Sequence, residues 1–425
     1  MTNIRKEVVY GFADQALLSL TNFLLGIFLV KHVTKEEYGL YVIGNAIVLF
    51  IVGLANGLIT TQMTVLAPSK SDSNRDGYCA GMLQAQNIIL IPVLLISLCL
   101  LYFLDQYAGI SWFSLGLAIS LALPGILLIE FLRRYFYLQL RPAAVLSMDV
   151  IYVLAVFAVL FLATVTIPKN LHITMFIILG FVALASGIVV MTTIRFPLRT
   201  ARDSTISSLR EAWQQGKWAL GGVIVTTMQS QAYVYILGAL AGPARVAEAN
   251  AAYLFLAPLS MLSTSFGRVF MPHMAILRSQ GENRRVESLA NKLLLLLVVA
   301  TVGYATVIII AKEWLIGLLL TKHYQDIGMF IVIWSVVFLF MAWRTNLSIL
   351  LQIYSRFSII TKVNTASAIA VLVATYILTK KYDVIGSLVS LAGGELLLGY
   401  FLWKAFNNVK KPFKVSRTYP SEIDL

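Results

Sequence analysis

The chain has 425 residues, of which 59% are hydrophobic and 12% are charged, and its mean hydropathy is +0.82. Soluble globular proteins carry about 25% charged residues, so this composition excludes a soluble enzyme, a disordered protein and a disulfide scaffold. The net charge of +13 does not indicate nucleic acid binding, because the basic residues are scattered through short loops and form no dense tract. The composition predicts an all-α polytopic membrane protein.

Twelve stretches of the chain are apolar enough and long enough to cross a bilayer, which takes about 20 residues each. The first stretch lacks a small-residue cleavage site, so we expect it to remain as the first helix. The expected spans cover residues 8–30, 39–66, 80–104, 112–132, 146–167, 173–194, 218–240, 250–276, 293–311, 327–351, 358–378 and 384–403.

The distribution of basic residues predicts the orientation of these spans. If the N-terminus is cytoplasmic, 23 of the 33 Lys and Arg residues lie on the cytoplasmic side and eight on the other. Basic residues concentrate in cytoplasmic loops of membrane proteins, so we expect both termini to be cytoplasmic. Most of the net positive charge is therefore explained by the orientation of the spans and gives no information about a substrate.

One polar segment divides the chain into two six-helix lobes, which we expect at residues 1–196 and 218–406. The segment between them, 197–217, is expected to be a cytoplasmic linker with an amphipathic helix or a solvated connection, and 407–425 a basic cytoplasmic tail. Six spans return the chain to the same side of the membrane, as parallel repeats in transporters require. Weak similarities between the lobes, such as Asn74-Arg75 and Asn283-Arg284, support an internal repeat in a two-lobed transporter.

Two arginines fall inside expected spans, where a charge is costly and marks a functional site by default. Arg268 lies ten residues before Arg278 and Arg344 lies twelve before Arg356, which places each about 15–18 Å deep. A guanidinium group binds phosphate oxygens in a bidentate manner, so Arg268 and Arg344 are candidate ligands for a substrate phosphate or pyrophosphate. The alternative is that each pairs with an intramembrane carboxylate, for which Asp14, Glu130 and Glu395 are available.

Asp14 and Glu395 are the candidate coupling residues, because a carboxyl group within a membrane can carry a proton or a cation. The alternative for both is a hydrogen bond that packs helices. Neutral polar groups complete the candidate site: Gln231 and Tyr235 share one face of the span 218–240 with Thr227, and Asn56 lies in the second span. Amides and aromatic rings suit a sugar, although they equally suit bonding between helices.

No motif for enzymatic chemistry or a cofactor is evident in the sequence. It contains no phosphate-binding Gly-x-x-x-x-Gly-Lys loop, no His-Glu-x-x-His and no Cys-x-x-Cys. We therefore expect no enzyme activity, no cofactor and no metal, and we expect any uphill transport to draw on a gradient of H⁺ or Na⁺.

Three segments resemble the polysaccharide-transport family, the Wzx-type flippases in the superfamily that also holds the multidrug and toxin extruders. They are KEEYGLY at 35–41, LAGPARVAEANAAY at 240–253 and EFLRRYFYLQLRPAAVLSMD at 130–149. The resemblance implies a protein of the bacterial cytoplasmic membrane that moves an undecaprenyl-pyrophosphate-linked oligosaccharide to the outer leaflet by alternating access. It also implies a cationic cavity, a place for Asp14 in coupling, and a polysaccharide polymerase and chain-length machinery as partners.

Three other readings compete with the flippase. A cation-coupled multidrug exporter of the same fold is the main one, although it would need acidic groups in its cavity where we expect two arginines. A transporter of the major facilitator class is disfavoured. Its loop after the second span usually has a Gly-x-x-x-Asp-Arg-x-Gly pattern, whereas this loop reads APSKSDSNRDGYC. A membrane polymerase or ligase would need a large external loop, and the expected external loops are short.

Overall fold

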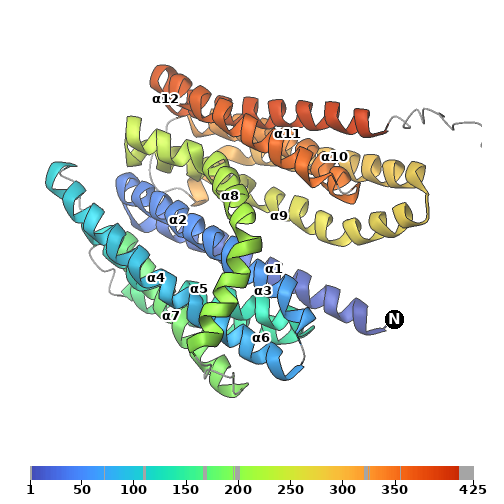
Figure 1. Ribbon diagram of the computed structural model, residues 1–425. Coiled ribbons are helices and arrows are strands. Elements are labelled where there is room, and N and C mark those ends of the chain that lie inside the picture. The colour runs from blue at the N-terminus through green and yellow to red at the C-terminus, as the bar shows by residue number, and fades with distance from the viewer. Residues whose placement is uncertain are drawn as a thin grey trace, which may run out of the picture.

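The computed structural model describes residues 2–70, 72–108, 112–165, 170–194, 196, 202–319, 324, 326–354 and 356–410 (Figure 1). Every regular element in those ranges is helical, so the predicted all-α fold is confirmed. The first four helical elements are α1 (Thr2–His32), α2 (Lys35–Ala55), the π-helix η1 (Asn56–Thr60) and α3 (Thr61–Leu66). They are followed by the 3₁₀ turn η2 (Ala67–Ser69), α4 (Asp72–Ala108), α5 (Trp112–Leu138), α6 (Pro142–Val165), α7 (Leu171–Thr193), α8 (Arg202–Ala241), α9 (Pro243–Ser279), α10 (Asn283–Leu319), α11 (Ile327–Ile353) and α12 (Phe357–Lys410).

Ten helical stretches of the described chain are long and apolar enough to cross a membrane, which makes the protein a multi-pass membrane protein. The last of them, Ser358–Asn408, holds two of the expected spans. The two spans share the label α12 but are two helical arms separated at Asp383, where φ is 54° and ψ is −132°. A β-carbon on Gly386 would lie 1.9 Å from the carbonyl oxygen of Leu378, so the two arms of α12 meet closely just beyond the break. The span expected at 250–276 lies within α9.

The start of α2 is fixed by a local hydrogen-bond pattern. Thr34 accepts a bond from the backbone N–H of Glu37 at 3.2 Å, while the Glu37 carboxylate accepts one from the Thr34 N–H at 2.8 Å. This reciprocal pair satisfies two donors that a helix start otherwise leaves free. The helix then widens into the π-helix Asn56–Thr60 and continues as α3. Single-turn π-helices inside α-helices often occur at functional sites.

We divide the helices into a first group, α1 to α7, and a second group, α8 to α12. In the first group α5 lies against α7 and α1 against α6; in the second, α11 and α8 lie against α12 and α9 lies against α11. Contacts between the groups are also extensive: α2 packs on both α8 and α9, α1 packs on α9, and α4 packs on α8. The segment expected as a linker is not separate from the membrane helices, because α8 runs unbroken from Arg202 to Ala241 and crosses the molecule between the groups (Figure 1). The lobe boundaries and the internal repeat stay predictions.

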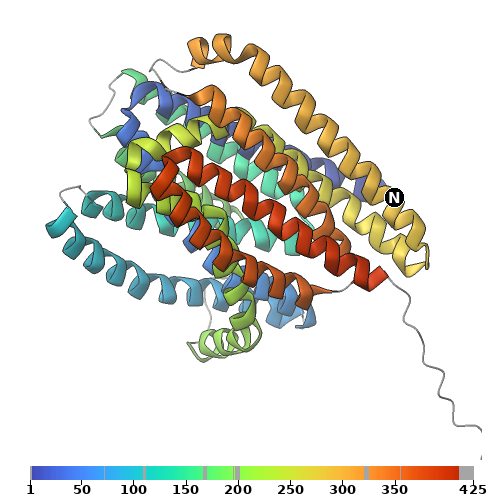
Figure 2. The ribbon, with the colours of Figure 1, turned by 90° about the horizontal axis from the view of Figure 1, so that it is seen from above.

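The helix ends define two ends of the molecule. The N-terminus, the turn from α9 to α10 and the last turn of α12 lie at one end, which we call the N-terminal end (Figures 1 and 2). The turn from α8 to α9 and the break in α12 lie at the other, which we call the distal end. That the N-terminal end is cytoplasmic stays a prediction, and most of the expected tail, residues 411–425, is outside the described ranges.

Candidate functional site

A cavity of about 270 Å³ lies between α8, α11 and α12. Seven of its eight described lining residues carry a polar group, although the helices that form the cavity are apolar over most of their length. Among these described residues, Leu398 is the one with an aliphatic side chain and no polar group. The lining residues are Thr226, Thr227, Gln229 and Ser230 of α8, Arg344 of α11, and Asn364, Glu395 and Leu398 of α12.

Arg344 and Glu395 form an ion pair within this cavity. The Nε of Arg344 donates to Oε2 of Glu395, and the two side chains are 25% and 15% exposed. Sequence reasoning identified both residues but gave them separate roles, as a substrate ligand and a coupling residue. The structure brings them together, which is also the pairing that the sequence left open as an alternative. An anion that binds Arg344 therefore has to compete with Glu395.

The remaining polar groups of the cavity have specific hydrogen-bonding capacities. The hydroxyls of Thr226 and Ser230 donate to backbone carbonyls of α8, at 2.9 Å and 3.1 Å. They therefore keep their lone pairs available to a ligand. The side-chain oxygen of Asn364 is buried and accepts no hydrogen bond in the described structure. The cavity thus combines one guanidinium group with several acceptors, a set that suits a ligand with both anionic and hydroxyl groups.

The other predicted ligands lie outside the lining of this cavity. Tyr235 donates its hydroxyl to the carbonyl oxygen of Ala46 at 2.9 Å, which joins α8 to α2. The side-chain oxygen of Asn56 accepts a bond from Thr60 at 2.7 Å, inside the π-helix. Gln231 is half-buried on α8, next to the cavity residue Ser230. The roles of these residues as sugar ligands stay predictions.

Arg268 belongs to the helical backbone of α9, but its side chain, with those of the other residues in 261–269, is outside what the structure describes. Whether it meets Arg344 in one cavity therefore stays a prediction.

A second polar cluster lies in the first helix group, where three elements contribute buried charged side chains. Asp149 of α6 is fully buried and binds Arg133 of α5, with Oδ1 2.7 Å from Nη2 and 3.0 Å from Nε. Glu130 pairs with the same guanidinium, as its position one turn before Arg133 predicts. Asp14 of α1 is 5% exposed, accepts a 3.2 Å bond from the Tyr137 hydroxyl, and lies near enough to Asp149 and Arg133 for their charges to act on its carboxyl group.

Among the side chains that the structure describes, the charges of this second cluster do not balance. Three carboxyl groups, those of Asp14, Glu130 and Asp149, lie around one guanidinium group, that of Arg133, and the Oδ1 of Asp14 is buried with no hydrogen-bond partner in the described structure. Two adjacent carboxyl groups are stable together only when one holds a proton or a cation lies between them. Sequence analysis gave Asp14 a coupling role but assigned no such role to Asp149. The sequence did contain a sign of this cluster, because the segment 130–149 carries four of its residues: Glu130, Arg133, Tyr137 and Asp149.

Comparisons with known proteins identify the fold. No protein-family model and no curated protein matches the chain. Among solved structures, the lipid II flippase MurJ in an inward closed conformation has a TM-score of 0.74 at 13% identity, covering 93% of this chain and 87% of MurJ. An inward-facing multidrug resistance MATE family transporter of the MOP superfamily gives 0.69 at 13% identity, with 96% of both chains covered. The eukaryotic MATE transporter AtDTX14 gives 0.67 at 15% identity, again with 96% of both chains covered. The chain therefore has a MurJ- and MATE-like fold.

Proposed function

We propose that this protein is a flippase that moves a lipid-linked oligosaccharide with a pyrophosphate link across a bacterial cytoplasmic membrane by alternating access. The observation that carries the proposal is the cavity at Arg344, where a guanidinium group lies among hydroxyl and amide side chains inside the membrane helices. Phosphate oxygens match the guanidinium group, and sugar hydroxyls match the acceptors of Ser230 and Asn364. The likeness to a lipid II flippase in fold is consistent with such a substrate.

In this proposal Arg344, together with Arg268, binds the pyrophosphate, and Gln231 extends the sugar-binding surface along α8. Tyr235 and Asn56 would exchange their present hydrogen bonds for bonds to sugar hydroxyls. The undecaprenyl tail stays in the surrounding lipid while the head group crosses. A polysaccharide polymerase with its chain-length machinery would take the unit on the outer side.

We assign ion coupling to Asp14 rather than to Glu395. The Asp14 and Asp149 carboxyl groups share one guanidinium with Glu130, so this cluster has the negative charge needed to take up H⁺ or Na⁺. Glu395 is already neutralised by Arg344. Protonation of Asp14 would remove its repulsion with Asp149 and allow α1 and α6 to pack differently, which links the ion to the conformation of the first helix group.

The second candidate function is a cation-coupled multidrug exporter of the same fold, and a specific observation favours it too. Glu395 and the acceptor oxygens of Asn364, Thr226 and Ser230 face the same cavity, and a cationic drug could pair with the carboxylate. The likeness to a multidrug resistance transporter is as broad as the likeness to MurJ.

Transport by the purified full-length protein in proteoliposomes distinguishes the two functions. One assay follows a fluorescent undecaprenyl-pyrophosphate oligosaccharide from the inner to the outer leaflet, and the other follows ethidium against a proton gradient. A flippase moves the lipid-linked sugar in an Arg344-dependent manner and leaves ethidium in place. Arg344-independent movement of the sugar lipid, or export of ethidium alone, would overturn the proposal.

A further inference from the structure

At the distal end, a chain of ion pairs connects the two helix groups. Lys35, the first residue of α2, binds Glu248 of α9 with Nζ 2.9 Å from Oε1. The other carboxylate oxygen of Glu248 lies 2.8 Å from Nη1 of Arg245, and the Nε of Arg245 lies 2.9 Å from Oδ2 of Asp383, at the break in α12. The Lys35–Glu248 pair is the link that crosses from one group to the other.

Within the second helix group, Arg245 holds the Glu248 side chain in place. Its side chain is 7% exposed, against 24% for Lys35 and 44% for Arg245. The pKa of Arg245 lies above its ordinary value because the guanidinium group donates to Glu248 and lies near Asp383. A buried carboxylate stays ionised only when cations accompany it, and here Arg245 holds one carboxylate oxygen of Glu248 while the other faces Lys35 of α2.

The Lys35 ammonium group also contacts an aromatic ring of the opposite group. It lies 4.9 Å from the centre of the Tyr324 ring, just before α11. Burial raises the pKa of the Tyr324 hydroxyl, and the nearby carboxylates of Glu248 and Glu36 raise it further, so the phenol stays neutral. A cation over a neutral aromatic face is attracted to it. Lys35 therefore has two partners across the junction.

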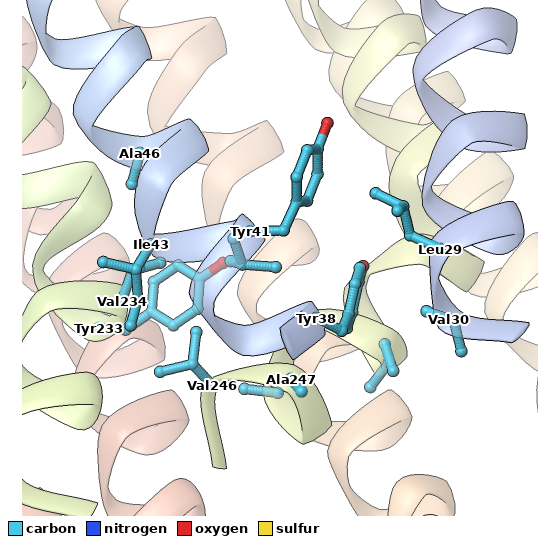
Figure 3. Close-up of a cluster of buried hydrophobic side chains, with 14 of the residues drawn as sticks. Leu29, Val30, Tyr38, Tyr41, Ile43, Ala46, Tyr233, Val234, Val246 and Ala247 are labelled. Carbon is cyan, nitrogen blue, oxygen red and sulfur yellow. The ribbon is translucent and has the colours of Figure 1, made fainter. Parts of the chain in front are cut away.

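Beneath the ion pairs the junction is mostly apolar and closely packed. Tyr38 is almost completely buried, between Leu29 and Val30 of α1 and Val246 and Ala247 of α9 (Figure 3). Its hydroxyl accepts a 2.7 Å hydrogen bond from the Asn250 amide of α9.

The backbones of α2 and α9 themselves meet at this junction. A β-carbon on Gly39 would lie 1.8 Å from the Pro243 carbonyl oxygen, so a larger residue could not allow the same approach.

We propose that the Lys35–Glu248 ion pair is a latch that holds the two helix groups together at the distal end, and that the transport cycle opens the protein there by breaking this pair. Arg245 and Asp383 position the latch from one side, and the Tyr38 layer seals the interior behind it. The inference holds for a flippase and for a drug exporter alike, because it concerns access rather than substrate.

Distance measurements on the full-length protein in nanodiscs test this latch. Spin labels are placed at the distal end of each group by Ser114→Cys at the exposed start of α5 and Lys380→Cys near the break in α12, in a Cys99→Ser background. Lys35→Gln and Glu248→Gln each remove the crossing link and should raise the ratio of long to short distances about tenfold, equivalent to about 1.4 kcal/mol. Lys35→Arg keeps the charge and should retain the short distance.

The matched control is Glu282→Gln, which removes a carboxylate from an ion pair with Arg285 at the N-terminal end. It should leave the distal distances unchanged. If Glu248→Gln yields no monodisperse protein, Lys35→Gln, with its more exposed side chain, supplies the result. Unchanged distances in the folded glutamine variant, or an equal shift in the control, would overturn the proposal.

Discussion

Arg344 of α11 and Glu395 of α12 form an ion pair although 51 residues separate them in the chain. Both side chains remain partly accessible from the cavity that they line. The pair neutralises the guanidinium group while no ligand is bound and leaves it able to exchange partners. The ion pair therefore lets the protein fold with an arginine inside the membrane, while the guanidinium group can still exchange its partner for an anionic substrate.

Arg344→Ala should weaken binding of the pyrophosphate group about tenfold to a hundredfold, because a hydrogen bond to a charged group contributes about 1.5–3 kcal/mol. Inorganic pyrophosphate binding to the purified protein, followed by calorimetry, measures this loss. Arg344→Lys should retain part of the affinity, since it keeps the charge without the planar fork. Equal binding by wild-type protein and Arg344→Ala would remove Arg344 from the substrate site.

Glu395→Gln should strengthen pyrophosphate binding several-fold, because the anion no longer displaces a carboxylate from Arg344. The same calorimetric titration measures the change. Glu313→Gln is the control, since Glu313 is 83% exposed and distant in sequence from the cavity residues. A cationic drug site predicts the reverse outcome, in which Glu395→Gln abolishes ethidium binding and leaves pyrophosphate binding unaffected.

Asp14→Asn should make transport independent of the ion gradient. The amide keeps the size of the side chain and can still accept a bond from Tyr137, but it cannot take up a proton at neutral pH. Initial transport rates in proteoliposomes, with and without an imposed H⁺ or Na⁺ gradient, measure the dependence. Asp326→Asn, at an exposed helix start, should keep the wild-type response, and a gradient-dependent Asp14→Asn protein would contradict the coupling role.

Arg133→Ala should destabilise the protein by about 3–5 kcal/mol, because it leaves buried carboxylates without their cation. The neighbouring Arg134 has an exposed side chain, so Arg134→Ala should change the stability little. Thermal unfolding of both variants in the same detergent gives the comparison. Equal unfolding temperatures would show that the cluster does not depend on Arg133.

Gly125→Ala should destabilise the packing of α5 on α7 by about 1–3 kcal/mol. The added carbon would lie 2.0 Å from the Gly180 carbonyl oxygen, a backbone atom that cannot rotate away. Gly303→Ala on α10 is the control, because no atom lies within 4 Å of its added carbon and alanine favours a helix. Thermal unfolding should separate the two variants, and a stable Gly125→Ala protein would refute this account of the α5–α7 contact.

The sequence was sufficient for the helix content and the positions of most spans, because apolar length alone decides which segments cross a bilayer. It did not predict that residues 202–217 continue into α8, since their polar composition left open both a separate amphipathic helix and a solvated connection, and no residue marks whether a helix continues into the next span. It also did not predict the π-helix at Asn56–Thr60, although Asn56 and Gly57 at its start are poor helix formers.

The charged residues of the candidate site could be identified from the sequence, but the partner of each charge could not. Arg344, Glu395 and Asp14 stand out because charges are rare in membrane spans. Their partners depend on how each helix is rotated about its axis, which packing decides and hydropathy does not record. The meeting of Asp14 with Asp149, from helices far apart in sequence, therefore emerged from the fold alone.

The most direct test of the central claim is the rate at which the purified protein moves a fluorescent undecaprenyl-pyrophosphate oligosaccharide between the leaflets of proteoliposomes. The account predicts rapid movement by the wild-type protein, little by Arg344→Ala and an intermediate rate by Arg344→Lys. Movement at the same rate in wild-type protein and Arg344→Ala, or none in wild-type protein that exports ethidium, would contradict it.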